Sequence, residues 1–259
     1  MGAETSDAPR AWRTVLEHVE TQLLEGALRP GDRLPGERAL SAELGVGRSS
    51  VREALRVLEV LGLIRTAAGS GPNSGAIIIA TPGGGMSALM RLQVAASGFP
   101  VADIVRTRLI LESSVAGDLA EATAGARASA GDPADASAAT DAPAAPNLAP
   151  AALLLDAMDS PGLTPTEFLA LDAAFHLALA EASGNQVITA TMAGLRSGIE
   201  GYALEGVAAI ADWHATSARL RAEHRGIVEA ITRGDAASAR TRTHDHISGY
   251  YAETFVDAP

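Results

Sequence analysis

Residues 34–58 read LPGERALSAELGVGRSSVREALRVL, and this stretch decides the fold of the N-terminal part. Its first half predicts a short helix over residues 34–44, closed by Gly45, which can adopt the left-handed conformation that ends a helix. A further helix opens near Arg48, four residues later. Two short helices joined by a tight glycine-containing turn are typical of a helix-turn-helix.

The helix that opens near Arg48 has two distinct faces. The residues predicted to be buried are Val51, Leu55, Leu58 and Leu61. The opposite face carries a row of arginines at i, i+4 and i+8, namely Arg48, Arg52 and Arg56. Arginine can hold phosphates or bind O6 and N7 of guanine bidentately, and serine hydroxyls suit phosphate oxygens. The row would equally fit an ordinary solvated face shared with Glu53 and Glu59, so spacing alone leaves DNA contact open.

The flanking segments extend this motif to a winged form. Helical spacing of apolar residues from Trp12 to Leu23 predicts a first helix, and Arg29-Pro-Gly-Asp-Arg33 predicts a turn. Residues 66–75 lie between two apolar, strand-like pieces, the second at residues 76–79, which predicts a β-hairpin wing. The tip of this wing has no Lys, Arg or His, so a phosphate contact there would use backbone amides.

The composition of the whole chain excludes several kinds of site. Among its 259 residues there is no cysteine, which rules out disulfides, thiolate metal ligands and cysteine catalysis. The net charge of −11 is unevenly distributed: residues 1–80 carry nine arginines and ten acids, residues 81–259 eleven and twenty-one. Local arrangement therefore decides whether the N-terminal part binds nucleic acid. With no long apolar run and a polar, acidic N-terminus, a cytoplasmic protein is expected.

The C-terminal part is predicted to be a helical bundle. Residues 81–98 begin with Thr-Pro-Gly-Gly-Gly and are expected to form a flexible junction followed by a short helix from Met86 to Ala96. Thr164-Pro-Thr-Glu167 has the residues of a capping box, so a helix should run from there to Ala182 and stop at Ser183-Gly184. Further helices are predicted over 101–121, 185–205, 209–233 and 235–256.

Between these helices, residues 122–150 consist almost wholly of Ala, Gly, Pro, Ser, Thr and Asp. Such a composition buries too little apolar surface to order itself, which predicts a mobile insertion. The alternative is an alanine-rich helix near Ala124–Ala130 that is cut short by Gly131-Asp-Pro133.

The acidic and histidine residues of these helices suggest a metal site. Asp172 and His176 are four residues apart, so they lie one above the other on a helix face. His224 and His246 fall in two other predicted helices and would complete a set of three nitrogens and one oxygen for a divalent ion. A single helical histidine is more often a surface or packing residue. Periodicity alone does not choose between His246 and His244, which point about 200° apart on a helix.

The N-terminal motif resembles the winged helix-turn-helix of the GntR superfamily of transcription factors. The resemblance rests on Pro30-Gly-Asp-Arg-Leu-Pro-Gly-Glu-Arg38 and on Leu44-Gly-Val-Gly-Arg-Ser-Ser-Val-Arg-Glu-Ala-Leu-Arg-Val-Leu58. It covers about residues 10–80 and implies a DNA-binding domain that acts on double-stranded operator DNA as a homodimer. The DNA contacts that it implies are Arg38, Arg48, Ser50, Arg52 and, in the wing, Gly69. The long, neutral wing departs from the family pattern, which usually has a basic or histidine tip.

The C-terminal part is similar to the FCD effector domain of the FadR subfamily. The matching motifs are Arg108-Leu-Ile-Leu-Glu112, Leu171-Asp-x-x-Phe-His176 with Ser183-Gly-Asn185, Glu223-His-Arg-Gly-Ile-Val-Glu-Ala-Ile231 with Gly234-Asp235, and His246-Ile247. The resemblance implies an effector domain over residues 99–256 that holds one divalent ion of the Zn, Ni or Mn type. The metal ligands that it implies are Asp172, His176, His224 and His246, so His244 is expected to face away.

Arg108 matches a family position near the effector pocket and would clamp an anionic group. An intrahelical pair with Glu112 is the alternative for this arginine.

The expected protein is therefore mainly α: three helices and a hairpin wing, followed by an all-helical effector bundle. It is expected to be a transcriptional regulator, in the first instance a repressor, whose operator affinity depends on a small carboxylate or hydroxycarboxylate bound at the metal. The alternative is a regulator for which the ion itself is the signal. A metal-dependent hydrolase is a minor alternative, because the sequence shows no obvious general base beside the ligands, no phosphate loop and no nucleophile motif. We therefore expect no enzymatic activity.

Overall fold

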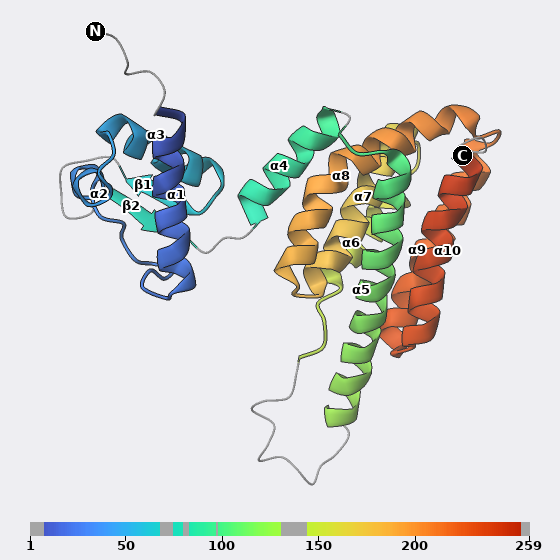
Figure 1. Ribbon diagram of the computed structural model, residues 1–259. Helices are drawn as coiled ribbons and strands as arrows, with labels where there is room; N and C mark the ends of the chain where they lie inside the picture. Colours follow the sequence, from blue (N-terminus) through green and yellow to red (C-terminus); the bar gives the residue numbers. More distant parts are fainter. Residues whose placement is uncertain (1–7, 68–74, 80–82, 97, 131–143, 255–259) are drawn as a thin grey trace. The chain divides into compact units, whose positions relative to one another are not determined.

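The computed structural model describes residues 8–67, 75–79, 83–96, 98–130 and 144–254. The chain divides into two compact units, Met1–Met86 and Ser87–Pro259 (Figure 1). Described residues of the first unit form helices and a two-stranded sheet, and those of the second form helices and their connections. The predicted fold class, a winged helix-turn-helix followed by a helical bundle, is confirmed. No described helix is long and apolar enough to cross a membrane.

The first unit has the order helix, helix, helix, strand, strand. Its elements are α1 (Ala8–Leu24), α2 (Glu37–Leu44), α3 (Arg48–Val60), β1 (Ile64–Ala67) and β2 (Gly75–Ile78). The strands are antiparallel, with Ile64 opposite Ile78. Helix α2 begins three residues later than predicted, because Leu34 precedes a proline and is held extended by donating its backbone N–H to Ala76 O at 2.9 Å.

The turn between α2 and α3 depends on Gly45, which has φ = 65° as expected for a left-handed C-cap. The core of this unit packs Val15 and Leu40 against α3. On α3 the predicted face is correct except at Leu61, which is 40% exposed. The helix ends at Val60, so Leu61 no longer follows the helical face, and Ala54 is buried instead.

The second unit is a bundle reached through α4. Its elements are α4 (Gly83–Ala95), α5 (Val101–Ala130), α6 (Ala149–Met158), α7 (Pro165–Ala182), α8 (Gln186–Gly206), the short 3-10 helix η2 (Val207–Ala209), α9 (Trp213–Arg233) and α10 (Ala236–Thr254). Helix α5 contacts α7, α8, α9 and α10, and so lies at the centre of the bundle. In Figure 1, α5 (green) runs alongside α9 and α10 (orange to red).

Three sequence predictions in this part need correction. The glycines expected in a flexible junction, Gly83–Gly85, form the first turn of α4, where backbone N–H groups have no helical partner in any case. Residues 122–130, expected in a mobile insertion, extend α5, as the alanine-helix alternative predicts, because alanine has the highest helix propensity. Residues 149–158 form α6, for which no helix was predicted; residues 131–143 lie outside the described part.

Helix α9 begins at Trp213 rather than at residue 209. The Asp212 side chain accepts a hydrogen bond from the backbone N–H of Ala215 at 3.1 Å, so it supplies the N-cap that the sequence analysis overlooked. Gly234, with φ = 78°, closes the helix at its other end.

The capping box of α7 is present as predicted. The Thr164 hydroxyl accepts from the backbone N–H of Glu167 at 3.2 Å, and the Glu167 carboxylate accepts from the backbone N–H of Thr164 at 2.9 Å. This cap fixes the start of the helix that carries Asp172 and His176.

Thr164→Ala should therefore lower the free energy of unfolding by about 1 kcal/mol, because it leaves a backbone N–H of the first turn without its side-chain acceptor. Chemical denaturation of the full-length protein measures this change. The matched control is Thr241→Ala, at an exposed position within α10 where alanine is the better helix former, so stability should stay constant or rise slightly. Equal losses in both variants would contradict the capping role.

Candidate metal centre and DNA-binding face

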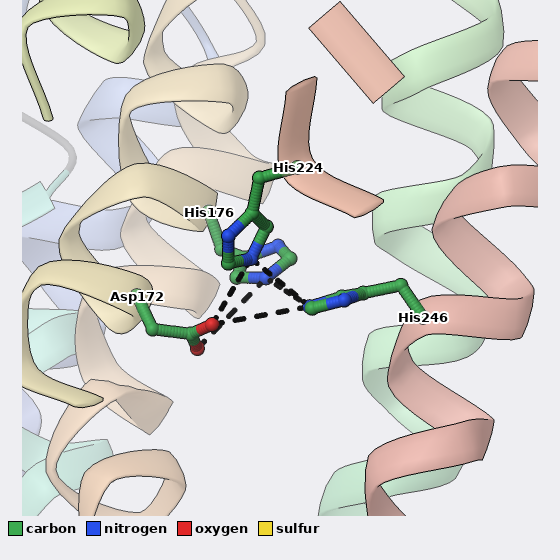
Figure 2. A group of neighbouring side chains, drawn as sticks. All are labelled: Asp172, His176, His224 and His246. Atoms are coloured by element: carbon green, nitrogen blue, oxygen red, sulfur yellow. Dashed lines mark hydrogen bonds and ion pairs between the residues drawn. The ribbon is translucent and has the colours of Figure 1, made fainter. Parts of the chain in front are cut away.

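Four buried polar side chains meet inside the bundle. Asp172 and His176 come from α7, His224 from α9 and His246 from α10, and their side chains point toward one another (Figure 2). Each of the four is less than 8% exposed, and His224 is completely buried. One ligand atom from each residue lies within 4.8 Å of all the others.

The separations in this cluster are short. Nε2 of His246 lies 3.1 Å from Nε2 of His176 and 3.1 Å from Nε2 of His224. A carboxylate oxygen of Asp172 lies 3.0 Å from Nε2 of His224 and 3.9 Å from Nε2 of His246. Donor atoms bound to one ion at about 2.1 Å lie between about 3 and 4.2 Å apart, so these separations suit a single ion.

The proton positions also fit a cation. Nδ1 of His176 lies 2.5 Å from Oε2 of Glu112, and Nδ1 of His246 lies 2.9 Å from Oε2 of Glu223. A carboxylate favours a proton on the nitrogen that faces it, so in the neutral form of either ring the lone pair lies on Nε2. These two lone pairs face each other at 3.1 Å in a buried space, an arrangement that a cation between them would stabilise.

The electrostatics keep the cluster ready to bind a cation. Burial, together with the neighbouring His246, lowers the pKa of His224 to about 4 despite its contact with Asp172. Burial also lowers the pKa of His246 against the opposing effect of Glu223. For Asp172 burial acts to raise the pKa, but the hydrogen bond with His224 and the nearby imidazoles outweigh it and lower the pKa. At neutral pH His224 and His246 are therefore uncharged and Asp172 is ionised, so a cation can bind once the Nε2 proton that His224 directs at Asp172 is released.

No acid beside the ligands was predicted from the sequence, and the structure shows two. Glu112 contacts His176, and Glu223 contacts His246. Burial alone would raise the pKa of Glu112, but Arg108 and His176 outweigh it and lower the pKa to about 2. Both acids stand four residues after an arginine, Arg108 or Arg219, and this Arg-x-x-x-Glu spacing is the signal that could have found them.

Both readings left open for Arg108 are compatible with its geometry. Its Nε donates to Glu112 at 2.6 Å and its Nη1 to the Tyr202 hydroxyl at 2.5 Å, so the intrahelical pair is present. The residue is 5% exposed, and its Nη2 has no hydrogen-bond partner in the described structure. An unpaired buried guanidinium nitrogen is costly, which leaves a donor for an anionic group.

The remaining histidines lie apart from this cluster. His244 is exposed on α10, two residues from His246, and faces away. His214 is exposed near the start of α9. In the first unit, Nε2 of His18 lies 3.6 Å from a carboxylate oxygen of Glu43.

The candidate DNA contacts are unevenly exposed. Arg38, Arg48 and Arg52 are exposed, as is Arg56, but Ser50 is only 8% exposed and lies on the core side of α3. Gly69 lies outside the described residues. Arg52 makes a bidentate pair with Glu37, at 3.2 and 2.9 Å, which the sequence analysis did not anticipate. This pair holds the guanidinium of Arg52 on the exposed face of α3.

Comparisons with known families agree with both units. Residues 12–72 match the family model described as bacterial regulatory proteins, gntR family, and residues 103–249 match the FCD domain model. The FCD match alone spans more than half of the chain.

Similar curated proteins are regulators by name. LutR of Bacillus subtilis is 29% identical over 236 residues, covering 88% of this chain and 97% of that protein. The putative L-lactate dehydrogenase operon regulatory protein of Escherichia coli is 27% identical over 234 residues, covering 90% and 82%. The Glc operon transcriptional activator of Escherichia coli is 29% identical over 181 residues, covering 70% of this chain but only 64% of its own length.

Among solved structures, the GntR protein of Streptococcus agalactiae has the same fold. It matches with a TM-score of 0.52 at 22% identity, covering 92% of this chain and 97% of that one.

Proposed function

Because this chain belongs to the GntR family of FCD-containing transcriptional regulators, and is therefore no enzyme, we propose that an organic acid bound at a metal controls its DNA binding. The acid would be a small carboxylate or hydroxycarboxylate, and the metal one divalent ion per subunit of the Zn, Ni or Mn type. The comparisons give no support to a hydrolase.

The observation that carries the proposal is the convergence of three Nε2 atoms and one carboxylate in a buried space. Asp172, His176, His224 and His246 would hold the ion. Four protein ligands leave open places only on an ion that accepts five or six, and a bound ion of that kind supplies positive charge to a carboxylate. The family match adds the expectation of a metal, since the cluster lies within the FCD region.

Arg108 supports an anionic effector. Its Nη2 is buried without a partner, while Glu112 and Tyr202 fix the rest of its guanidinium. The carboxylate of an effector would accept from Nη2 and compensate this donor. The relative named for an L-lactate dehydrogenase operon makes lactate the first acid to test.

DNA binding would use the exposed arginines of the first unit. Arg38, Arg48 and Arg52 would contact phosphates and base edges of an operator, with Gly69 contributing from the wing and Ser50 only after a local change, because it is buried. We propose a homodimer, which presents two recognition helices to two half-sites. Repression is proposed as the mode of control, with the effector lowering operator affinity.

An operator titration tests this function. The operator is first selected from random duplex DNA with the full-length protein. Fluorescence anisotropy then measures its affinity for protein loaded with Mn²⁺, Ni²⁺ or Zn²⁺ in the presence of L-lactate, acetate or citrate, before and after chelation. At least one acid should weaken binding by about 5-fold or more, the usual scale of allosteric coupling, and chelation should remove this effect. Operator affinity that no acid and no metal alters would contradict the proposal.

The burial of the metal centre favours one alternative function, a regulator for which the ion itself is the signal. The three imidazoles of the centre are at most 3% exposed, so an acid would have to enter a well-shielded space. A regulator that responds to the ion itself needs no such entry. In the same titration it would show a large effect of Zn²⁺ alone and none of the acids.

A further inference from the structure

In two Arg–Glu pairs, each formed within one helix, the glutamate contacts a histidine of the candidate metal centre. On α5, Arg108 donates to Glu112 at 2.6 Å, and Glu112 lies 2.5 Å from Nδ1 of His176. On α9, Arg219 donates to Glu223 at 2.7 Å, and Glu223 lies 2.9 Å from Nδ1 of His246. The same arrangement thus occurs twice: an arginine contacts a carboxylate, and that carboxylate contacts the Nδ1 of a histidine.

We propose that Glu112 and Glu223 are positioning residues for the metal centre: each fixes the ring orientation and the proton position of one histidine, and each is held by its own arginine. Neither carboxylate is among the four ligands, and both act through a ligand. The inference rests on the proposed metal site and adds residues that decide how tightly the site binds.

The physical reason lies in what a histidine ligand needs. A ring that binds through Nε2 must carry its proton on Nδ1, and a carboxylate facing Nδ1 selects that form and makes the ring a stronger donor. Without such a partner the ring can rotate or place the proton on Nε2, where it blocks the metal. Buried Glu112 remains compatible with the core because Arg108 balances its charge.

The third histidine shows the contrast. Nδ1 of His224 is buried and faces no carboxylate among the described residues, whereas Nδ1 of His176 faces Glu112, and Nε2 of His224 lies 3.0 Å from Asp172. Its ring packs against Phe175, with centroids 4.7 Å apart. On its Nδ1 side, His224 is therefore held by packing rather than by a carboxylate, and the two positioning acids serve His176 and His246.

Arg219 also ties the second pair to the end of the bundle. It makes an ion pair with Glu253 on α10, and Glu253 accepts from the Thr216 hydroxyl at 2.7 Å. These contacts join α9 to the last turns of α10 on the same face as Glu223. They keep Glu223 in place even though its side chain is 29% exposed.

The test compares isosteric amide variants of the full-length protein, with Zn²⁺ alone as the probe and a chromophoric chelator as competitor. Glu223→Gln should weaken Zn²⁺ binding by about 10- to 100-fold, the usual cost of losing an outer carboxylate partner. The matched control is Glu229→Gln, which removes the charge of another i, i+4 Arg–Glu pair on α9, with Arg233, and should leave the affinity unchanged. Glu112→Gln should weaken Zn²⁺ binding in the same way. Glu112 is buried beside Arg108, so its replacement can also disturb folding, and the half-buried Glu223 therefore gives the decisive variant.

A second readout separates positioning from general stability. In the chelated protein, ¹⁵N chemical shifts of the His246 ring report which nitrogen carries the proton. Wild type should show the proton on Nδ1, and Glu223→Gln should increase the share on Nε2. Unchanged Zn²⁺ affinity, an equal loss in Glu229→Gln, or an unchanged proton position would each overturn the inference. Absence of Zn²⁺ binding by wild type would instead contradict the proposed function, while the ¹⁵N measurement would still test the positioning role.

Discussion

His224→Ala is expected to abolish metal retention by the full-length protein. His224 is completely buried, and its Nε2 lies within 3.1 Å of both Asp172 and His246, so no neighbouring side chain replaces it. Affinity for Zn²⁺ should fall by more than about 100-fold, beyond the cost of losing an outer partner. At a Zn²⁺ concentration 1,000 times the wild-type Kd, the stabilisation by the ion would drop from about 4 kcal/mol to about 1.4 kcal/mol or less. Metal analysis after gel filtration and thermal melts measure the two effects.

The matched control for this variant is His244→Ala. His244 is on α10 two residues from His246 but is exposed, so its removal should leave both Zn²⁺ content and the melting temperature of the loaded protein unchanged. After chelation, wild type and His224→Ala should bind operator DNA equally, because the first unit is untouched. Full Zn²⁺ occupancy in His224→Ala would remove this residue from the site.

Arg52→Ala is expected to weaken operator binding by about 10- to 100-fold, provided that the guanidinium contacts a base edge. Arg52 is exposed on α3, and its bidentate pair with Glu37 holds it in place. An exposed ion pair contributes little to folding, so thermal stability should stay nearly constant. Anisotropy with the selected operator, compared with unrelated duplex DNA, measures the loss and shows whether specificity falls with it.

The control for Arg52→Ala is Arg127→Ala, which makes the same change of charge at an exposed position on α5. Its operator affinity should match wild type at equal salt concentration. If Arg52→Ala also binds like wild type, the arginine row on α3 returns to the reading of an ordinary solvated face.

The elements that could be predicted from the sequence are those with local chemical signals. The Thr164 capping box and the left-handed position Gly45 fix helix ends through their own backbone and side-chain chemistry, and they are found where they were expected. The structure of residues 122–130, which carry weak local signals, was predicted less well. Alanine-rich residues 122–130 were expected in a mobile insertion, yet their helix propensity suffices once α5 already provides the preceding turns.

In the candidate site, too, the residues related by local spacing could be predicted, and those related only by contacts between helices could not. Asp172 and His176 share a helix face by their spacing. His224 and His246, about 50 and 70 residues further along the chain, could complete the set, but only the family resemblance selected His246 over His244. Glu112 and Glu223 were visible as acids four residues after an arginine, but contacts between helices decide which imidazole each one meets. The burial of Ser50 has the same origin, because packing of α3 against α1 determines which of its faces is covered.

The central claim, that an organic acid binds this regulator through a metal in the bundle, is tested most directly by thermal melts. Full-length protein loaded with Ni²⁺ or Mn²⁺, ions that accept six ligands, is melted with a panel of small carboxylates, including L-lactate, and the series is repeated after chelation. A ligand that binds only the folded state raises the melting temperature by mass action. We expect at least one acid to raise it in the loaded protein and to have no effect in the chelated protein. An increase that persists after chelation, or no increase with any acid despite a large one from the metal alone, would contradict the account.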